Sequence, residues 1–346
     1  MHWDSATLVI GLIVLFSLAF SMSNGWNDAA NAIATMVSTR ALPPWAAVAL
    51  GAVLNLVGAF MSSKVANTIG GEIADPQHLT ALTFLAAVIV APVWVGICTL
   101  RGLPISCSHS LMGGLIGAVL ASAGTAALRG AGMYKILFGI IISPLMGFAL
   151  GYLLMLGISW AFRRMRPTLA TALFDKLHVV SGGAMALAHG AGDAQTPMGL
   201  IAGALVAGGF VPMTIAADGS QALTIPAWVR VACALTMALG TAMGGWAVMK
   251  TLGSGISKLR AHQGFAASAG AATTILVNIL ARGIPVSTTH SMTGAITGVG
   301  ATQGVRAVKW GVGRKIVFAW VFTFPACIVG GWLLCWLFRL LHLGAG

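Results

Sequence analysis

Long apolar runs, separated by short polar gaps, follow one another along the whole chain. A helix needs roughly 20 apolar residues to cross a bilayer, and about ten of the runs come near that length. Strands of a membrane barrel are shorter and alternate in polarity, so these runs predict helices. We place the runs at residues 6–37, 44–63, 79–100, 104–122, 134–162, 177–208, 226–249, 262–282, 285–302 and 313–341.

The first run contains a polar stretch in its middle, at Asn24, Asn27 and Asp28. This run is too long for one upright span, and Gly25 lies within the polar stretch. We therefore expect a broken helix there. A later run carries Asp193 in a similar setting of Gly and amide residues, and we expect a second break at that point.

Three motifs of the first half recur in the second half in the same order. The matched segments are 23–32 with 188–197, 67–73 with 250–256, and 103–117 with 284–298. Three motifs in register predict a duplicated unit. Because each unit holds an odd number of runs, the second copy would enter the membrane in the opposite orientation. Inverted repeats with interrupted helices are typical of secondary transporters.

The sequence thus predicts an all-α polytopic membrane protein made of two inverted repeats of about five membrane segments each. Broken helices or helical hairpins are expected at the midplane. The repeats would be residues 1–162 and 177–346, joined by a basic cytoplasmic linker at 163–176. The runs at 104–122 and 285–302 either span the membrane or form re-entrant segments. If they re-enter, a long run such as 6–37 must supply another crossing to preserve the inversion.

Composition supports a membrane protein and excludes a soluble domain. Hydrophobic residues make up 58% of the 346 residues and charged residues 8%, with a mean hydropathy of +0.92. A soluble domain must cover its surface with more polar groups. The five cysteines lie in apolar runs without metal-type spacing, so we interpret them as buried small hydrophobic residues.

The net charge of +12 comes from basic residues in short loops rather than on one patterned face, which argues against nucleic-acid binding. Placing the 163–176 segment in the cytoplasm puts 13 of the 19 basic residues on that side, as the positive-inside rule expects. Both termini are then extracytoplasmic, and we predict a multi-pass protein of the cell's inner (plasma) membrane.

Two acidic residues require a functional explanation. Of the seven acids, only Asp28 and Asp193 lie within long apolar runs. A carboxylate at bilayer depth costs several kcal/mol and usually marks an ion path or a partner. The alternative, a cap at a new helix start, does not explain why both halves carry one.

Hydroxyl side chains gather at two predicted helix starts. Pro104 and Pro285 suit the first turn of a helix, and His109 and His290 occupy matched positions behind them. Free N–H groups and the helix dipole at such starts attract an anion; the alternative is ordinary capping with glycine-mediated packing. The candidate anion-binding hydroxyls are Ser106, Ser108, Ser110, Ser287, Thr288, Thr289 and Ser291.

A cation must share this site, because an acid would repel a bound anion by about 4 kcal/mol per charge pair at 4 Å and an effective dielectric near 20. Sodium at Asp28 and Asp193, held with amide and backbone oxygens, or protons on the two carboxylates would remove this repulsion. Bringing a divalent anion inward against 100 mV costs about 4.6 kcal/mol. Voltage can therefore drive the coupled uptake only if more than two cations accompany the anion.

These motifs resemble the inorganic phosphate transporter (PiT) family. Residues 25–32 (GWNDAANA) and 189–195 (HGAGDAQ) are similar to the two acidic signatures of that family, and 285–291 (PVSTTHS) to its hydroxyl motif, with 104–110 a looser copy. The resemblance implies secondary uptake of inorganic phosphate with sodium or protons, by alternating access, in a homodimer. It implies no cofactor beyond the coupling ion, and no enzymatic activity.

The resemblance also assigns roles and shows departures. It places the cation site at Asn27, Asp28, Asn31 and Asp193, and the phosphate site at Gln195 and the seven hydroxyls. This chain departs from the family pattern mainly in its second half, so we expect asymmetric coordination centred on Asp28. The departing positions are Asn67, Gly192, Thr196, Pro197 and Ser268.

Other functions must be weighed. Sulfate or another tetrahedral oxyanion is an alternative substrate, although the P–OH group of phosphate favours an ionised acceptor. Residues 190–193 read GAGD, the local pattern of intramembrane aspartyl proteases, in which two buried carboxylates share a proton. The duplicated hydroxyl motifs do not fit that activity. A passive anion channel is the third option, and the chain lacks the G-x-x-x-x-G-K-[ST] loop of ATP-driven pumps.

Overall fold

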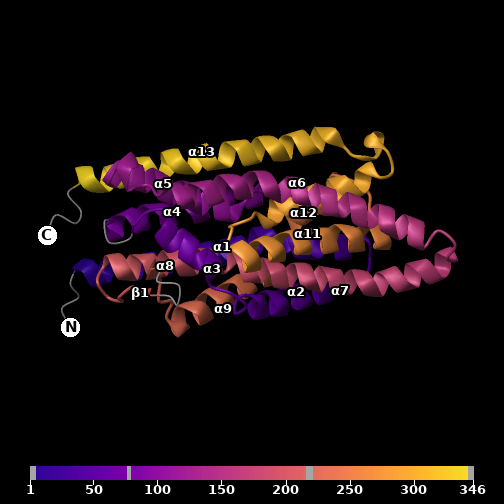
Figure 1. The fold of residues 1–346 in the computed structure, drawn as a ribbon, viewed down its shortest axis with the longest axis horizontal. Coiled ribbons are helices and arrows are strands. Elements are labelled where there is room, and N and C mark those ends of the chain that lie inside the picture. Colours follow the sequence, from indigo (N-terminus) through magenta and orange to yellow (C-terminus); the bar gives the residue numbers. More distant parts are fainter. Residues whose placement is uncertain (1–4, 76–78, 216–220, 342–346) are drawn as a thin grey trace.

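The computed structural model describes residues 5–75, 79–215 and 221–341, and nearly all of them are helical (Figure 1). The first half contains α1 (Ser5–Ser38), α2 (Pro44–Gly58), α3 (Lys64–Asn67), η1 (Thr68–Glu72), α4 (Ala81–Leu100), α5 (Cys107–Ser122), η3 (Thr125–Ala127) and α6 (Gly130–Ala161). The second half contains α7 (Pro167–Asp193), α8 (Gln195–Ala207), β1 (Thr214–Ile215), β2 (Gln221–Ala222), α9 (Ala227–Met243), α10 (Trp246–Lys250), η4 (Thr251–Gly255), α11 (Ala261–Arg282), α12 (Thr288–Ala301), η5 (Val305–Ala307) and α13 (Trp310–Leu340).

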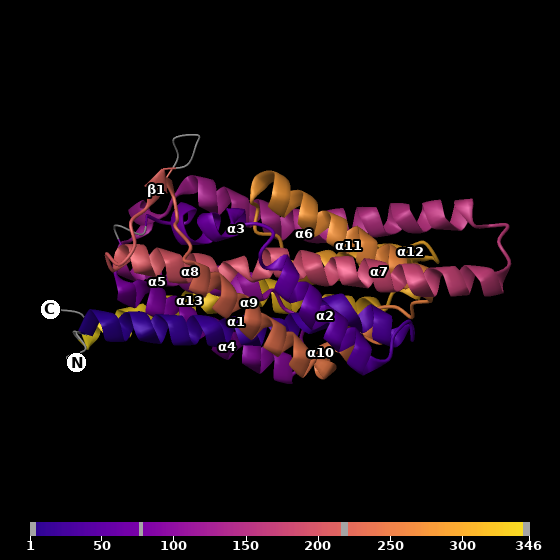
Figure 2. The ribbon, with the colours of Figure 1, turned by 90° about the horizontal axis from the view of Figure 1, so that it is seen from below.

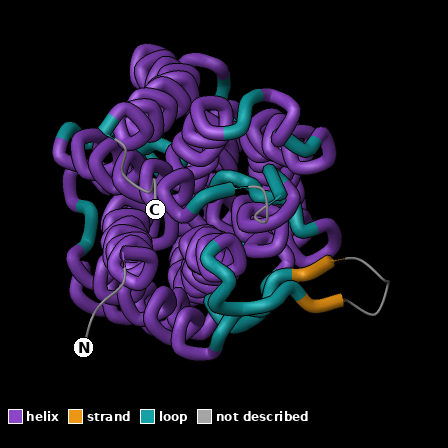
Figure 3. The backbone as a smooth tube through the Cα atoms, turned by 90° about the vertical axis from the view of Figure 1, so that its left-hand side faces the viewer, coloured by secondary structure: helices purple, strands orange, loops and turns teal. Residues whose placement is uncertain are grey.

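The helices form one elongated bundle. Among the described residues, five helices are long and apolar enough to cross a membrane, and α9 with α10 and η4 makes a further span bent by 60°. The start of α1 and the end of α13 lie at the same end of the bundle, opposite the connection between α6 and α7 (Figures 1 and 2). The prediction of a helical multi-pass membrane protein is confirmed. The short β1–β2 ribbon lies at the rim of the bundle (Figure 3).

The predicted break in the first run is wrong. Helix α1 continues through Asn24, Asn27 and Asp28 without interruption. Polar side chains there bond sideways to other helices, so they do not need to cap a new helix start. The second predicted break is present, since α7 ends at Asp193 and α8 begins at Gln195.

The two hydroxyl-rich helices are short. Helix α5 has 16 residues and α12 has 14, which correspond to about 24 and 21 Å and do not span a hydrocarbon core of about 30 Å. Each packs against the preceding helix as a hairpin, α4 with α5 and α11 with α12. The two hairpins occupy opposite ends of the bundle (Figure 1).

Two local predictions also need correction. Pro104 and Pro285 do not lie in the first helical turn, because Ser106 and Ser287 are the N-cap residues of α5 and α12. The basic linker is shorter than expected. Helix α7 begins at Pro167, so the connection from α6 is a turn of only a few residues and the rest of the 163–176 segment is helical.

Glycines mark matched contacts in the two halves. A Cβ on Gly117 of α5 would collide with the carbonyl oxygen of Ile328 in α13, and one on Gly298 of α12 would collide with that of Phe148 in α6. In the same way, Gly331 of α13 lies against Gly114, and Gly151 of α6 against Ala295. Each hairpin therefore packs on the long helix that follows the other hairpin, α5 on α13 and α12 on α6, as expected for a duplicated unit.

Another matched pair of glycines lets the two helices that carry the acids, α1 and α7, approach their neighbours closely. Gly25 of α1 leaves no room for a Cβ beside the Met237 carbonyl of α9, and Gly190 of α7 leaves none beside the Asn55 carbonyl of α2. These close crossings hold α1 and α7 deep in the bundle. All five cysteines are buried and free, which confirms their interpretation as small core residues.

Candidate functional site

Helix α1 carries its polar residues on one stripe. Asn24, Asn27, Asp28 and Asn31 are spaced three or four residues apart, so they share a face of the helix. All four are buried, with at most 1% of their surface exposed. The unbroken helix thus presents a carboxylate and three amides to the middle of the bundle.

Asp28 is held by the start of α12. Its Oδ1 accepts hydrogen bonds from Thr289 Oγ1 at 2.8 Å and from Asn31 Nδ2 at 2.9 Å. Asn31 Nδ2 also contacts Thr289 Oγ1 at 2.9 Å and Thr288 Oγ1 at 3.3 Å. The first-half acid is therefore bound by hydroxyls of the second half.

Asp193 is held by both short helices. Ser108 of α5 donates to Asp193 Oδ1 at 2.7 Å, and Thr288 of α12 donates to Asp193 Oδ2 at 2.9 Å. Thr288 Oγ1 also lies 3.3 Å from Asp28 Oδ2. One hydroxyl thus joins the two carboxylates, and the two acids, predicted to meet, lie in a single cluster.

His189 is a site residue that the motif comparison did not single out. Its Nε2 lies 3.3 Å from Asp193 Oδ2 and 3.8 Å from Asp28 Oδ2, and the side chain is fully buried. The signal was available, because residues four apart on a helix are neighbours. Ligating atoms of Asp28, His189 and Asp193 all lie within 4.8 Å of one another.

A second layer of polar residues fixes the imidazole. Asn55 Nδ2 donates to Thr241 Oγ1 at 2.7 Å, which directs Asn55 Oδ1 toward His189 Nδ1 at 2.8 Å. His189 Nδ1 therefore donates to this oxygen. Asn24 Oδ1 lies 3.3 Å from His189 Nε2.

Two predicted site residues, Gln195 and Asn27, form their hydrogen bonds with groups other than the carboxylates. Gln195 Oε1 accepts from the backbone N–H groups of Val65 and Ala66, at 2.9 and 3.2 Å, and its amide donates to the Ala191 carbonyl. It ties α8 to the start of α3. Asn27 Nδ2 bonds Thr99 Oγ1 at 2.7 Å, which ties α1 to α4.

The remaining serines build the helix starts. Ser106 and Ser287 accept from the backbone N–H groups of the residues three positions later, at 3.3 and 3.1 Å. Ser110 and Ser291 bond back to the carbonyls of those caps, at 3.0 and 2.8 Å. Of the seven predicted hydroxyls, three form hydrogen bonds with the carboxylates, and the other four order the two helix starts.

Some buried polar atoms have no hydrogen-bond partner within the described ranges. They include the amide oxygens of Asn27 and Asn31, on the same helix face as Asp28. The imidazoles of His109 and His290 also carry unpartnered nitrogens, and their ring centroids lie 5.0 Å apart. A crevice too narrow to hold a water molecule is lined by Ser108, Asp193 and Pro285.

The positions that depart from the family pattern have structural partners. Thr196 Oγ1 lies 3.5 Å from Ser108 Oγ, beside the Asp193 carboxylate. Asn67 Oδ1 accepts from the Leu223 N–H at 3.0 Å. Ser268 Oγ lies 3.1 Å from Thr35 Oγ1, one helical turn from Asn31.

A pair of carboxylates buried beside a helix break and two helix starts, in a polytopic membrane protein, is characteristic of secondary transporters. Comparison with known proteins agrees. The model of the phosphate transporter family matches residues 24–331. A probable low-affinity inorganic phosphate transporter of Rhizobium meliloti (strain 1021) is 43% identical over 320 residues, covering 92% of this chain and 93% of that protein.

A protein of the same description from Bacillus subtilis (strain 168) is 39% identical over 324 residues, covering 93% of this chain and 95% of its own. A solved structure described as the sodium-dependent phosphate transporter matches with a TM-score of 0.87 and 24% identity, over 96% of this chain and 99% of the other. That likeness establishes the fold.

The chain belongs to the phosphate transporter family, as its motifs predicted. It is a transporter and not an enzyme, which rules out the intramembrane protease alternative.

Proposed function

We propose that this protein imports inorganic phosphate in symport with cations, and that Asp28 and Asp193 form the cation-coupling centre. The observation that carries the proposal is the joining of both buried carboxylates to the starts of α5 and α12 through Ser108, Thr288 and Thr289. Similarity to the probable phosphate transporters of Rhizobium meliloti and Bacillus subtilis supports phosphate as the substrate.

The cation side of the site is rich in oxygen. The site offers a set of oxygen ligands suited to a hard cation such as sodium. They are the two carboxylates, the hydroxyls bound to them and the unpartnered amide oxygens of Asn27 and Asn31. The sodium-dependent phosphate transporter of the same fold supports this choice over protons. We assign Asn27, Asp28, Asn31 and Asp193 to cation coupling.

The phosphate side is formed by two helix starts. Their unpaired N–H groups and dipoles favour a bound anion. Ser108, Thr288 and Thr289 are suited to contact phosphate directly, since each lies in the first turn of its helix. Ser106, Ser110, Ser287 and Ser291 would act by ordering those turns, and Gln195 by positioning the break after Asp193.

Charge balance explains why the two sides lie together. The carboxylates would repel phosphate unless cations neutralised them first, so phosphate binding depends on cation binding. Moving a divalent anion inward against 100 mV costs about 4.6 kcal/mol, and cations carried with it offset this cost. Coupling thus follows from the composition of the site.

The remaining features of the proposal concern assembly and placement. Matched glycine contacts in the two halves support two inverted repeats, 1–162 and 177–346, that move against each other in alternating access. Basic residues in the loops support placement in the inner membrane with the α6–α7 connection in the cytoplasm and both termini outside. We also propose that the protein is a homodimer, as its family resemblance implies.

The substrate assignment is tested by counterflow of labelled phosphate into proteoliposomes preloaded with unlabelled phosphate. We expect uptake that survives a large excess of external sulfate, because sulfate lacks the P–OH donor for a carboxylate. Uptake that sulfate suppresses as well as unlabelled phosphate does would contradict phosphate selectivity.

A further inference from the structure

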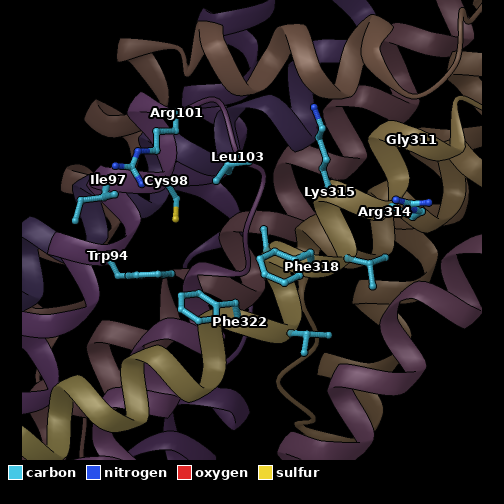
Figure 4. Close-up of a pocket in the computed structure, with 13 residues that line it drawn as sticks. Trp94, Ile97, Cys98, Arg101, Leu103, Gly311, Arg314, Lys315, Phe318 and Phe322 are labelled. Carbon is cyan, nitrogen blue, oxygen red and sulfur yellow. The ribbon is translucent and has the colours of Figure 1, made fainter.

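An apolar groove lies beside the α4–α5 hairpin and does not include Asp28 or Asp193 in its lining. It runs between the end of α4 and the first turns of α13 and encloses about 930 Å³ (Figure 4). Trp94, Phe318 and Phe322 form much of its apolar wall, and the rings of Trp94 and Phe322 are 5.8 Å apart. Phe318 is 71% exposed.

Three basic side chains border this apolar groove. Arg101 follows the end of α4, and Arg314 and Lys315 lie in the second turn of α13. All three are exposed. Within the described ranges, no carboxylate forms an ion pair with any of them. An amphiphile with a negative head would complement both features of the groove.

In the other half, the basic residue equivalent to Lys315 is neutralised by a carboxylate. The contacts of Gly117 with Ile328 and Gly298 with Phe148 align α13 with α6, which makes Lys135 the counterpart of Lys315. Lys135 Nζ lies 2.6 Å from Glu72 Oε2.

In the second half, the position aligned with Glu72 is Gly255. The positive charge on Lys315 therefore lacks the partner that its counterpart Lys135 has.

The depth of Arg314 and Lys315 fits the membrane surface. From Val317 to Leu341, α13 exposes large apolar side chains at regular intervals, as a lipid-facing helix does. Arg314 and Lys315 come directly before this stretch. Basic side chains at the end of an apolar span lie at the level of lipid headgroups.

We propose that the groove between α4 and α13 binds an anionic phospholipid. The headgroup phosphate would lie against Arg101, Arg314 and Lys315, and an acyl chain along the aromatic wall. Free phosphate would not use the apolar wall. Among the described residues, a second copy of this chain offers only the half-buried Asp175 as complementary charge, because Glu72 and Asp75 are paired and the site acids are buried.

The bound lipid would contact the α4–α5 hairpin. Arg101 lies at the tip of that hairpin, which leads directly to Ser108 of the acidic site. Trp320 Nε1 of α13 donates to the Pro104 carbonyl in the same tip at 3.0 Å. A bound lipid would therefore brace the hairpin against α13.

The test is native mass spectrometry of the purified full chain, titrated with phosphatidylglycerol or with phosphatidylcholine of the same acyl chains. We expect selective retention of phosphatidylglycerol. The variant Arg314→Gln/Lys315→Gln should bind it roughly 25-fold more weakly, since each basic residue near an anionic lipid contributes about fivefold. Arg163→Gln/Arg164→Gln, which removes the same charge from the α6–α7 turn, should bind it as the wild type does.

Equal retention of both lipids, or equal losses in the two variants, would overturn the proposal. Displacement of phosphatidylglycerol by millimolar inorganic phosphate would also overturn it. The same holds for a lipid-free protein dimer that forms in the wild type and is lost only in the Arg314→Gln/Lys315→Gln variant. A thermal unfolding midpoint measured on each variant confirms that it is folded. Because lipid retention is measured without transport, its failure leaves the proposed phosphate symport untouched.

Discussion

Replacing one site carboxylate by the corresponding amide should impair cation coupling and leave the fold intact. In Asp28→Asn, the amide oxygen can take the place of Oδ1 and accept from Asn31 and Thr289. Its NH₂ group can take the place of Oδ2 and donate to Thr288 Oγ1, which lies 3.3 Å from that atom. The substitution therefore keeps the shape and hydrogen bonds of the site and removes one charge.

The expected effect follows from Coulomb's law. Ligating atoms of the site lie within 4.8 Å of one another. At that distance and an effective dielectric near 20, one pair of unit charges interacts by about 3.5 kcal/mol, which is a factor of about 300 in affinity. Asp28→Asn and Asp193→Asn should each raise the cation concentration for half-maximal phosphate uptake by about that factor.

The assay is the initial rate of labelled phosphate uptake into proteoliposomes over a range of sodium concentrations and pH values. At ordinary cation concentrations, both variants should show no concentrative uptake. Asp175→Asn, which removes a carboxylate on α7 far along the chain from the site, is the matched control and should behave as the wild type. Unimpaired accumulation in either site variant would refute the assignment of the carboxylates.

Three further predictions concern the surroundings of the site. Gly190→Ala should lower stability by about 1–3 kcal/mol because its methyl group would meet backbone, whereas Gly11→Ala, with open space around it, should leave the thermal midpoint in detergent unchanged. Ser108→Ala removes a hydrogen bond to a buried carboxylate, worth about 1.5–3 kcal/mol, and should weaken uptake at least tenfold in phosphate titrations; a normal titration would remove Ser108 from the site. Glu72→Gln breaks a partly exposed pair with Lys135 and should change stability by no more than about 1 kcal/mol, so a large loss on chemical unfolding would contradict its peripheral role.

Apolar periodicity and motif spacing were sufficient to predict most of the helices and the meeting of the two acids. Asp28 and Asp193 stand out because charge is rare in apolar runs, and that rarity has a direct energetic cause. The hydroxyls that reach them are equally visible, since they recur at matched positions of two helix starts.

The interpretation of α1 failed because polar residues have two ways to satisfy their hydrogen bonds. Asn27 and Asp28 were expected to interrupt the helix, yet their partners are Thr99, Thr288 and Thr289, which only the tertiary structure supplies. Similarly, Gln195 follows an acidic motif in sequence but turns toward the backbone of α3. Local spacing does not reveal which neighbour a buried amide will find.

His189 shows what spacing can reveal when it is used fully. Its position four residues before Asp193 places it on the same helix face, although its contacts with Asn24 and Asn55 depend on helices far apart in sequence. The short length of α5 was not predicted. The apolar run at 104–122 includes the loop residues before the N-cap Ser106, so the helix is shorter than the run.

The central claim is that phosphate transport is coupled to a cation at the Asp28–Asp193 site. The most direct measurement is the final internal phosphate concentration in proteoliposomes under an imposed inward sodium or proton gradient. The account predicts internal phosphate above the external concentration, collapsing to equality when an ionophore dissipates the gradient. Internal phosphate that only equals the external concentration under both gradients would indicate a passive channel and contradict the account.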